Sequence, residues 1–338
     1  MNTLKLALIG YGNAAKAFTG MLNKKKNDIL SEYGCKVDIV AICTKSKGAI
    51  INPNGIDINI FKKDNIDSLF NKELDSFYVI DNVDYDVMIE TTPINIFTGQ
   101  PAIDHIKHTF DRKKHVITAN KGPIARAYSQ LKTIAEDNNS LFFYETTVMD
   151  GTPVFNLVED TLRGCKITGI QGILNSTTNY VLNEIGKGIA FEEAVAEGQI
   201  RGFVEADPSM DLDGWDSSAK LTALMNVMMD ARITPDQINR TGITKITKED
   251  LDDAKSNGNI IKLMCKGEFK NGRPVGIVAP LEISQDSMFA TINGTAAALT
   301  ITTDLFGDIS IIEHVHEPEI DQTAYGILSD LYRVLENI

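Results

Sequence analysis

Three carboxylates and one lysine stand close together in the segment 202–221, and their types and spacing could bind and protonate a small polar substrate. Glu205, Asp211 and Asp216 could hold an ammonium and a hydroxyl group, while Lys220 could give a proton to a reacting oxygen. Asp216 and Lys220 are four residues apart, which places both on one face of a helix. Clustered like charges shift pKa values and destabilise a fold, and functional sites tolerate this more readily than surfaces do. A capping aspartate with a surface salt bridge would use the same residues, so the spacing alone leaves both interpretations open.

A glycine-rich pattern follows the first apolar run of the chain and opens a helix-like segment. The pattern is G-x-G-x-x-A, formed by Gly10, Gly12 and Ala15 with Asn13 and Ala14 between them. Gly10 would allow a tight turn, Gly12 would let the backbone approach a pyrophosphate, and a small third residue would let the helix close on the strand. Free N–H groups at the helix N-terminus would then bind the phosphates. The sequence therefore predicts a dinucleotide site.

The end of the second apolar run bears on which dinucleotide binds. Enzymes that select NAD usually place a carboxylate there for the ribose 2′-hydroxyl, whereas this chain has Lys45 and Lys47. Two lysines could accept a 2′-phosphate, so NADP is favoured over NAD. Lysines on a solvated loop would look the same in sequence, and that alternative stays open.

The elements that must position these groups follow from the apolar pattern. Through residues 1–145, apolar runs alternate with amphipathic, helix-length segments, which is typical of a parallel sheet covered by helices on both faces. The runs are LKLALIGYG, VDIVAICT, YDVMIETTP, KHVITANKGP and SLFFYETTV. Over 146–303, helical segments mix with strands in hairpin-like order. We predict an α/β chain with a Rossmann-type parallel sheet domain at 1–145 and an α+β substrate domain at 146–303.

Composition excludes several classes of protein. The chain has 338 residues, of which 43% are hydrophobic, enough to bury a core in each of two domains. Its net charge of −13 disfavours a nucleic-acid partner. No stretch approaches the ~20 apolar residues of a membrane helix, and the N-terminal run resembles a strand rather than a signal peptide. The four cysteines form no C-x-x-C pair. We therefore expect a cytoplasmic protein with reduced thiols and no membrane partner.

The segment 202–221 closely resembles the signature of homoserine dehydrogenases, which runs from a glycine and an aromatic residue through Glu-Ala-Asp-Pro to Lys-Leu. Other features of that family follow in the expected order: the glycine loop, Thr91-Thr92-Pro93, the segment 118–121 and the segment 172–180. The resemblance covers essentially the whole chain and is to the short, monofunctional form without a regulatory domain. It implies a homodimer in which the second domain also mediates dimerisation, and a Rossmann domain completed by 304–338.

The same resemblance implies an activity and roles for matching residues. The activity is interconversion of L-aspartate 4-semialdehyde and L-homoserine with NAD(P)H by direct hydride transfer, in the threonine and methionine branch of amino-acid biosynthesis. Lys220 is the implied proton donor, with Asp216 as its partner. The implied substrate ligands are Glu205, Asp211, Asp216 and Thr177, and Lys121 is implied to lie between nicotinamide and substrate. Together with the patterns above, the cofactor-binding residues we predict are Gly10, Gly12, Asn13, Ala14, Ala15, Lys45, Lys47, Thr91, Thr92 and Lys121.

Family members also hold a sodium ion by a glutamate and nearby backbone carbonyls. The matching positions here are Glu145, Val148, Asp150 and Thr152. The resemblance therefore implies a sodium site at the junction of the two predicted domains.

The chain departs from the family pattern at three places. Phe203 stands where a tyrosine is common, and Ser176 replaces a usual glycine. In the segment 314–322, Glu317 and Glu319 occupy a turn that the family makes from glycines, which should weaken cofactor binding by repelling phosphate. These departures keep two alternatives open. One is a cofactor-binding sensor or impaired relative of the same fold, and the other is a dehydrogenase for another small aldehyde or amino acid.

Overall fold

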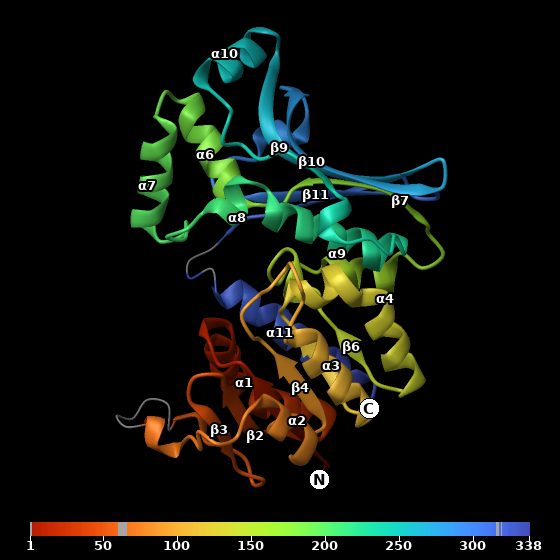
Figure 1. Cartoon of the computed structure of the whole chain (residues 1–338). Coiled ribbons are helices and arrows are strands. Elements are labelled where there is room, and N and C mark those ends of the chain that lie inside the picture. Colours follow the sequence, from red (N-terminus) through yellow and green to blue (C-terminus); the bar gives the residue numbers. More distant parts are fainter. Residues whose placement is uncertain (1, 60–65, 316–317, 319) are drawn as a thin grey trace. The chain divides into compact units, whose positions relative to one another are not determined.

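Two six-stranded sheets organise the chain, each within its own unit (Figure 1). The computed structural model describes residues 2–59, 66–315, 318 and 320–338. One unit comprises 1–157 together with 316–338, and the other comprises 158–315. The boundaries differ from those predicted, which were 145 and 303. Three residues of the unusual turn, His316, Glu317 and Glu319, lie outside the described residues.

The first sheet has the order β3-β2-β1-β4-β5-β6. Its strands are β1 (Asn2–Ile9), β2 (Cys35–Thr44), β3 (Gly48–Ile51), β4 (Val87–Glu90), β5 (His115–Thr118) and β6 (Phe142–Phe143). All neighbours are parallel except β3, which is antiparallel to β2. The apolar runs therefore predicted the five parallel strands correctly, and β3 was missed.

Helices cover both faces of this sheet, and β1 shows why. Leu4, Leu6 and Leu8 point to a core shared with α1 (Asn13–Tyr33) and α11 (Ile320–Glu336). Ala7 and Ile9, on the opposite face, pack in a core with the remaining helices. Those helices are α2 (Ser76–Asn82), α3 (Ala102–Asp111) and α4 (Lys121–Asp137). A strand buried on both faces needs apolar residues at every position, which is the pattern that the sequence carries.

The C-terminal helix α11 belongs to the first unit and lies beside α1 (Figure 1). Its apolar positions recur at helical spacing and are all buried: Ala324, Ile327, Leu328, Leu331 and Leu335. Residues 304–315, assigned to the first domain from the sequence, instead belong to the second unit. The reason is that β12 (Asp308–Glu313) pairs antiparallel with β11 (Ala297–Thr303).

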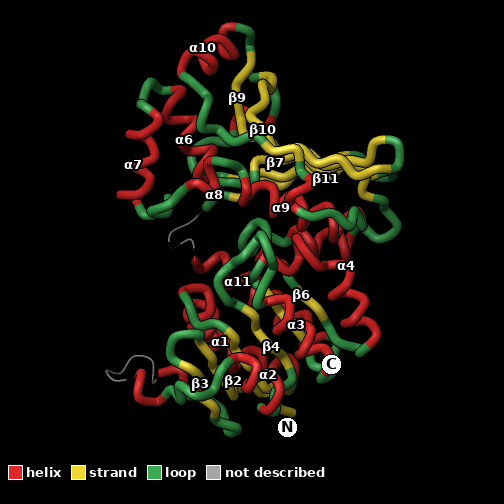
Figure 2. The backbone as a smooth tube through the Cα atoms, in the orientation of Figure 1, coloured by secondary structure: helices red, strands yellow, loops and turns green. Residues whose placement is uncertain are grey.

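The second sheet has the order β12-β11-β7-β9-β10-β8. The strands not yet given are β7 (Ile167–Ile173), β8 (Asn239–Arg240), β9 (Asn259–Lys270) and β10 (Arg273–Ser284). The α-helices of this unit are α6 (Ser176–Gly186), α7 (Phe191–Arg201), α8 (Ser209–Leu212), α9 (Trp215–Met229) and α10 (Lys248–Ser256). Figure 2 shows the long β9–β10 hairpin in yellow beside the helices.

The chain also contains several short helical turns. The turns are η2 (Ile66–Leu69), η3 (Glu145–Thr147), α5 (Val154–Asn156), η4 (Leu157–Thr161), η5 (Pro235–Gln237) and η6 (Met288–Thr291).

The helix α9 packs closely on the second sheet because β9 has a glycine at the contact. A Cβ added at Gly267 of β9 would lie 2.7 Å from the sulfur of Met225, so a larger residue there would push α9 away from the sheet. Within the described ranges, no helix has both the length and the apolar character needed to span a membrane.

Candidate active site

The glycine-rich pattern lies at the carboxyl end of β1 and opens α1. Gly10 has φ +95°, and a Cβ there would collide with the backbone of Thr91. Gly12 is the N-cap of α1, and an added Cβ would meet nothing within 4 Å. No side chain caps this helix and its first turn carries no acid, which leaves its N-terminal N–H groups without a side-chain cap. Ala15 is fully buried between helix and sheet. These residues fit the pyrophosphate of a dinucleotide.

Lys45 and Lys47 lie in a tight turn that joins β2 to β3. Lys45 is exposed, and the ammonium of Lys47 lies 6.0 Å from the centre of the Phe70 ring. The hydroxyl of Thr44 accepts a hydrogen bond from the backbone N–H of Lys47 at 3.1 Å. The turn follows the carboxyl end of β2, where Cys43 O accepts the N–H of Gly10 at 2.9 Å. Two cations therefore stand next to the glycine loop, at the edge where a Rossmann fold holds the adenosine ribose.

The carboxyl ends of β4 and β5 meet at that same edge. Glu90 is in register with Ile9 of β1 and with Thr118 of β5. Thr91 follows Glu90, and its hydroxyl donates to Gly10 O at 3.1 Å. Thr92 donates its N–H to the Glu90 carboxylate at 3.0 Å. The structure therefore brings the predicted cofactor residues Thr91 and Thr92 beside the glycine loop, and adds Glu90, which the sequence did not single out.

Lys121 begins α4, directly after β5. Asn120 is the N-cap of this helix, and its Oδ1 accepts the N–H of Gly122 at 3.0 Å. Its Nδ2 donates to Thr92 O at 3.3 Å, which ties the loop after β5 to the loop after β4. The Lys121 side chain is half-buried. Lys121 thus starts a helix at the carboxyl edge of the first sheet, and its implied role between nicotinamide and substrate stays a prediction.

Two aspartates and a lysine converge in the second unit, around an asparagine. Asn175 Nδ2 donates to Asp211 Oδ1 at 2.7 Å and to Asp216 Oδ2 at 3.1 Å. Lys220 Nζ lies 3.2 Å from that same oxygen of Asp216. Burial, together with the charge of Asp216, raises the pKa of the Asp211 carboxyl; hydrogen bonds from Asn175 and Thr177 and the charge of Lys220 oppose the shift. One amide thus separates two carboxylates that would otherwise repel each other.

Local backbone features explain how these groups reach one another. Asn175 is the N-cap of α6, and its Oδ1 accepts the N–H of Thr178 at 2.9 Å while its amide group faces the aspartates. Gly214, with φ +78°, turns the chain from α8 into α9. Lys220 donates to Leu174 O at 2.8 Å, at the end of β7. The lysine is therefore fixed by a carbonyl and a carboxylate, with 19% of its side chain exposed.

Most of the predicted substrate residues come together, and one does not. Thr177 hydrogen-bonds Asp211 from the first turn of α6. Glu205 is exposed, and the contacts there involve its backbone carbonyl, which accepts from Gln199 Nε2 at 3.0 Å. Asn175 lies within the family-like segment 172–180 but was not predicted as a site residue. The signal that could have found it is an asparagine directly before Ser-Thr-Thr, which is typical of a helix N-cap.

The predicted sodium residues have other partners. The Glu145 carboxylate accepts the N–H groups of Val154, Phe155 and Asn156 at 2.7–2.8 Å, and so caps α5. Asp150 has φ +42° and accepts the hydroxyl of Thr323 at 2.8 Å. Three N–H donors on one carboxylate suit a helix cap better than a cation, because a carboxylate offers about four lone-pair sites. The Glu145 carboxylate therefore serves as a helix cap in this structure, and we derive no chemical step through the ion.

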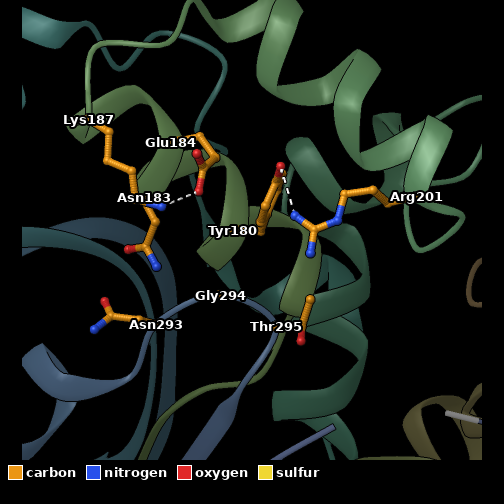
Figure 3. A pocket seen from close by; sticks show the side chains of 8 residues that line it. All are labelled: Tyr180, Asn183, Glu184, Lys187, Arg201, Asn293, Gly294 and Thr295. Carbon is orange, nitrogen blue, oxygen red and sulfur yellow. Dashed lines mark hydrogen bonds and ion pairs between the residues drawn. The ribbon is translucent and has the colours of Figure 1, made fainter. Parts of the chain in front are cut away.

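A separate groove of about 570 Å³ lies along the outer side of α6 (Figure 3). Its two cations are already engaged. Lys187 pairs with Glu184 at 2.6 Å, and Arg201 pairs with Glu197 at 3.7 Å and lies over the Tyr180 and Phe203 rings. The ring of Phe203, which stands where the family has tyrosine, packs edge-on against Tyr180. The groove is therefore polar, and both of its cations already have partners.

Comparisons with known proteins agree with this geometry. A family model described as "Homoserine dehydrogenase, NAD binding domain" matches residues 10–145, and one described as "Homoserine dehydrogenase" matches 153–332. A homoserine dehydrogenase of Methanocaldococcus jannaschii is 37% identical, with 98% of each chain covered. An NAD(+)-dependent homoserine dehydrogenase of Pseudomonas canavaninivorans is 32% identical, over 99% of this chain and 97% of that protein.

A solved structure resembles this chain in both fold and sequence. The crystal structure of a putative homoserine dehydrogenase from Archaeoglobus fulgidus superposes with a TM-score of 0.85 at 28% identity, covering 98% of this chain and 99% of that one. Both family models, both relatives and this structure carry the same assignment along nearly all of the chain. The chain belongs to the homoserine dehydrogenase family of NAD(P)-dependent oxidoreductases.

Proposed function

We propose that this chain interconverts L-aspartate 4-semialdehyde and L-homoserine, with Lys220 as the proton donor. The observation that carries the proposal is the cluster in which Asn175 bridges Asp211 and Asp216 while Asp216 pairs with Lys220. A surface salt bridge would not explain a half-buried aspartate that shares an asparagine with its neighbour. An ammonium held by a carbonyl and a carboxylate, at the mouth of such a cluster, suits a general acid.

The nicotinamide, when bound, supplies the hydride to the aldehyde carbon or accepts it in the reverse direction. The residues of the chain do the rest. Lys220 gives its proton to the aldehyde oxygen as negative charge develops there, and takes it back from homoserine in oxidation. Asp216 holds the ammonium of Lys220 in place. Asp211 binds the α-ammonium of the substrate, and Glu205, which is exposed and lies outside the cluster, is proposed to add a second carboxylate when the substrate is bound.

Turnover by the purified protein tests this function. We expect L-homoserine to reduce NAD⁺ or NADP⁺, with L-threonine and L-serine as much poorer substrates. A protein that binds NADPH but turns over no homoserine would instead be the sensor considered above. Turnover of a different amino alcohol with higher kcat/KM would favour the other alternative, a dehydrogenase of related specificity.

The finer cofactor assignment is NADP in preference to NAD. It is supported by Lys45 and Lys47 at the end of β2 and by the lack of a carboxylate in that turn. The NAD(+)-dependent relative shows that this family includes members with the other preference. Comparison of kcat/KM for NADP⁺ and NAD⁺ tests this preference.

A sodium ion bound at the segment 145–152 stays a prediction, and it is tested by measuring activity as sodium is titrated.

A homodimer in the cytoplasm completes the proposal. Support for self-association comes from the edge of the second sheet, where Ile312 is 44% exposed on β12 and Leu305 and Phe306 are 74% and 67% exposed in the preceding turn. Exposed apolar side chains on an unpaired sheet edge suit a protein interface. Light scattering of the purified protein measures the state directly, and a monomer at micromolar concentration would refute it.

A further inference from the structure

The Glu90 carboxyl is a fully buried acid at the carboxyl edge of the first sheet. Its Oε1 accepts the N–H of Thr92 at 3.0 Å and also the Thr92 hydroxyl. Its Oε2 accepts the hydroxyl of Thr118 at 2.9 Å. Burying a carboxyl without a cation costs free energy, so a chain that keeps one there gains something in return.

The partners of Glu90 are the loops that border the cofactor site. Thr91, between Glu90 and Thr92, donates to Gly10 O, and its backbone fills the space where a Cβ on Gly10 would lie. Thr118 Oγ1 accepts the N–H of Asn120 at 3.0 Å, one residue before Lys121. One carboxyl group is therefore tied to both the loop after β4 and the loop after β5.

We propose that Glu90 is a positioning residue for the cofactor site: its carboxylate fixes Thr92 and Thr118, and so holds both loops against the Gly10 turn. The proposal rests on the NAD(P) site of the proposed function. It adds a residue that touches neither substrate nor cofactor, yet sets the shape of the edge on which the nicotinamide end must bind.

Protonation should change this network near neutral pH. Burial raises the pKa of the Glu90 carboxyl to about 7, and the hydrogen bonds from Thr92 and Thr118 oppose the shift. Its register neighbours Ile9 and Thr118 are uncharged, and among the described residues no charged group contributes. As an ion, Glu90 accepts from all three donors. As an acid it donates from one oxygen, and the hydroxyl of Thr92 or Thr118 on that oxygen must turn its own proton away, which loosens the loop it holds.

Cofactor binding by Glu90→Gln and Thr118→Val tests the proposal. Dissociation constants for NADPH and NADH are measured by nicotinamide fluorescence from about pH 6 to about pH 8, alongside thermal unfolding. We expect wild-type affinity to rise through about pH 7, and both variants to bind about tenfold more weakly at about pH 8, the loss typical of one charged hydrogen bond. Glu90→Gln should also lose the pH dependence without a lower unfolding temperature.

Matched controls are Glu136→Gln and Thr133→Val, both exposed on α4, which should bind as the wild type does. Wild-type affinity in Glu90→Gln, or loss of affinity only together with a lower unfolding temperature, would overturn the proposal. If Glu90→Gln does not fold, NADPH binding by Thr118→Val tests the proposal, and wild-type affinity in that variant would overturn it. Homoserine oxidation is followed in the same samples, so normal NADPH binding without turnover counts against the proposed function and leaves the role of Glu90 standing.

Discussion

Replacing Lys220 gives the sharpest test of the mechanism. Its ammonium lies 2.8 Å from Leu174 O and 3.2 Å from Asp216 Oδ2, and the change to alanine removes both contacts and the proton donor. Loss of a positioned general acid lowers kcat by roughly 10²–10⁴-fold, about 3–5 kcal/mol of transition-state stabilisation. The pair with Asp216 is largely buried, so its loss should lower stability, but the fold should survive because no apolar core is lost.

The same structure predicts a second effect of this change. The charge of Lys220 lowers the pKa of the Asp211 carboxyl, so removing the lysine raises that pKa further above its usual range. Asp211 then loses its negative charge at a higher pH than in the wild type. Homoserine binding should weaken on the acid side of the profile, while KM at alkaline pH changes less than kcat.

Steady-state homoserine oxidation across pH measures both effects. Lys220→Met keeps the length of the side chain without its charge, and Lys220→Arg keeps the charge but cannot give up a proton. Both should be as slow as Lys220→Ala. The matched control is Lys187→Ala, a lysine of the same unit that is 67% exposed and paired with Glu184. A Lys220→Ala protein with near-normal kcat would refute the assigned donor, even though the family membership would stand.

Three further changes have defined outcomes. Lys47→Glu should bring kcat/KM with NADP⁺ closer to that with NAD⁺, and equal use of both by the wild type would contradict the assigned preference. Glu205→Gln should raise the KM for homoserine more than it lowers kcat, because an exposed carboxylate can bind the ammonium without taking part in proton transfer; a fall in kcat alone would count against this role. The raised pKa of Glu90, about 7 against an ordinary 4.5, means that the native state holds this proton more tightly than the unfolded chain does, so stability is lost as pH rises from 4.5 to 7. Glu90→Gln should therefore be more stable than wild type at about pH 8, by up to about 3 kcal/mol at ~1.4 kcal/mol per pKa unit, and no more stable at about pH 4 in denaturant titrations.

The sequence predicted those parts of the fold that repeat a simple pattern. The five parallel strands were found because burial on both faces leaves a continuous apolar run. The strand β3, Gly48–Ile51, was missed because a run of four residues is too short to show a periodic pattern. Residues 304–315, which contain β12, were assigned to the first domain, because a local apolar pattern does not identify the partner strand. A pattern along the chain thus specifies elements better than it specifies their neighbours.

The site residues likewise divide into those that the sequence predicted and those that it missed. Asp211, Asp216 and Lys220 were found because charges at that spacing are unusual and match a long family signature. Asn175 and Glu90 were not, because one reads as an ordinary helix cap and the other as the end of an apolar strand. Their roles depend on contacts between segments far apart in the chain: Asn175 reaches Asp216, and Glu90 reaches Thr118. Such contacts have no local signal.

Two ionisable side chains, Lys262 and Glu90, are buried and hydrogen-bonded to neutral groups. Lys262 of β9 is 1% exposed and has a pKa lowered to about 8 by burial, and its ammonium donates to the side chains of Asn179 and Asn183 on α6 and to Ile292 O. In the first unit, the partners of Glu90 among the residues that the structure describes are likewise neutral. Each of the two ties together segments that carry the site: Glu90 the loops beside the glycine turn, and Lys262 the helix that begins at Asn175. A neutral or apolar residue would cost less to bury at either position, so the charges are best explained by the strength and direction of the hydrogen bonds that only an ion gives.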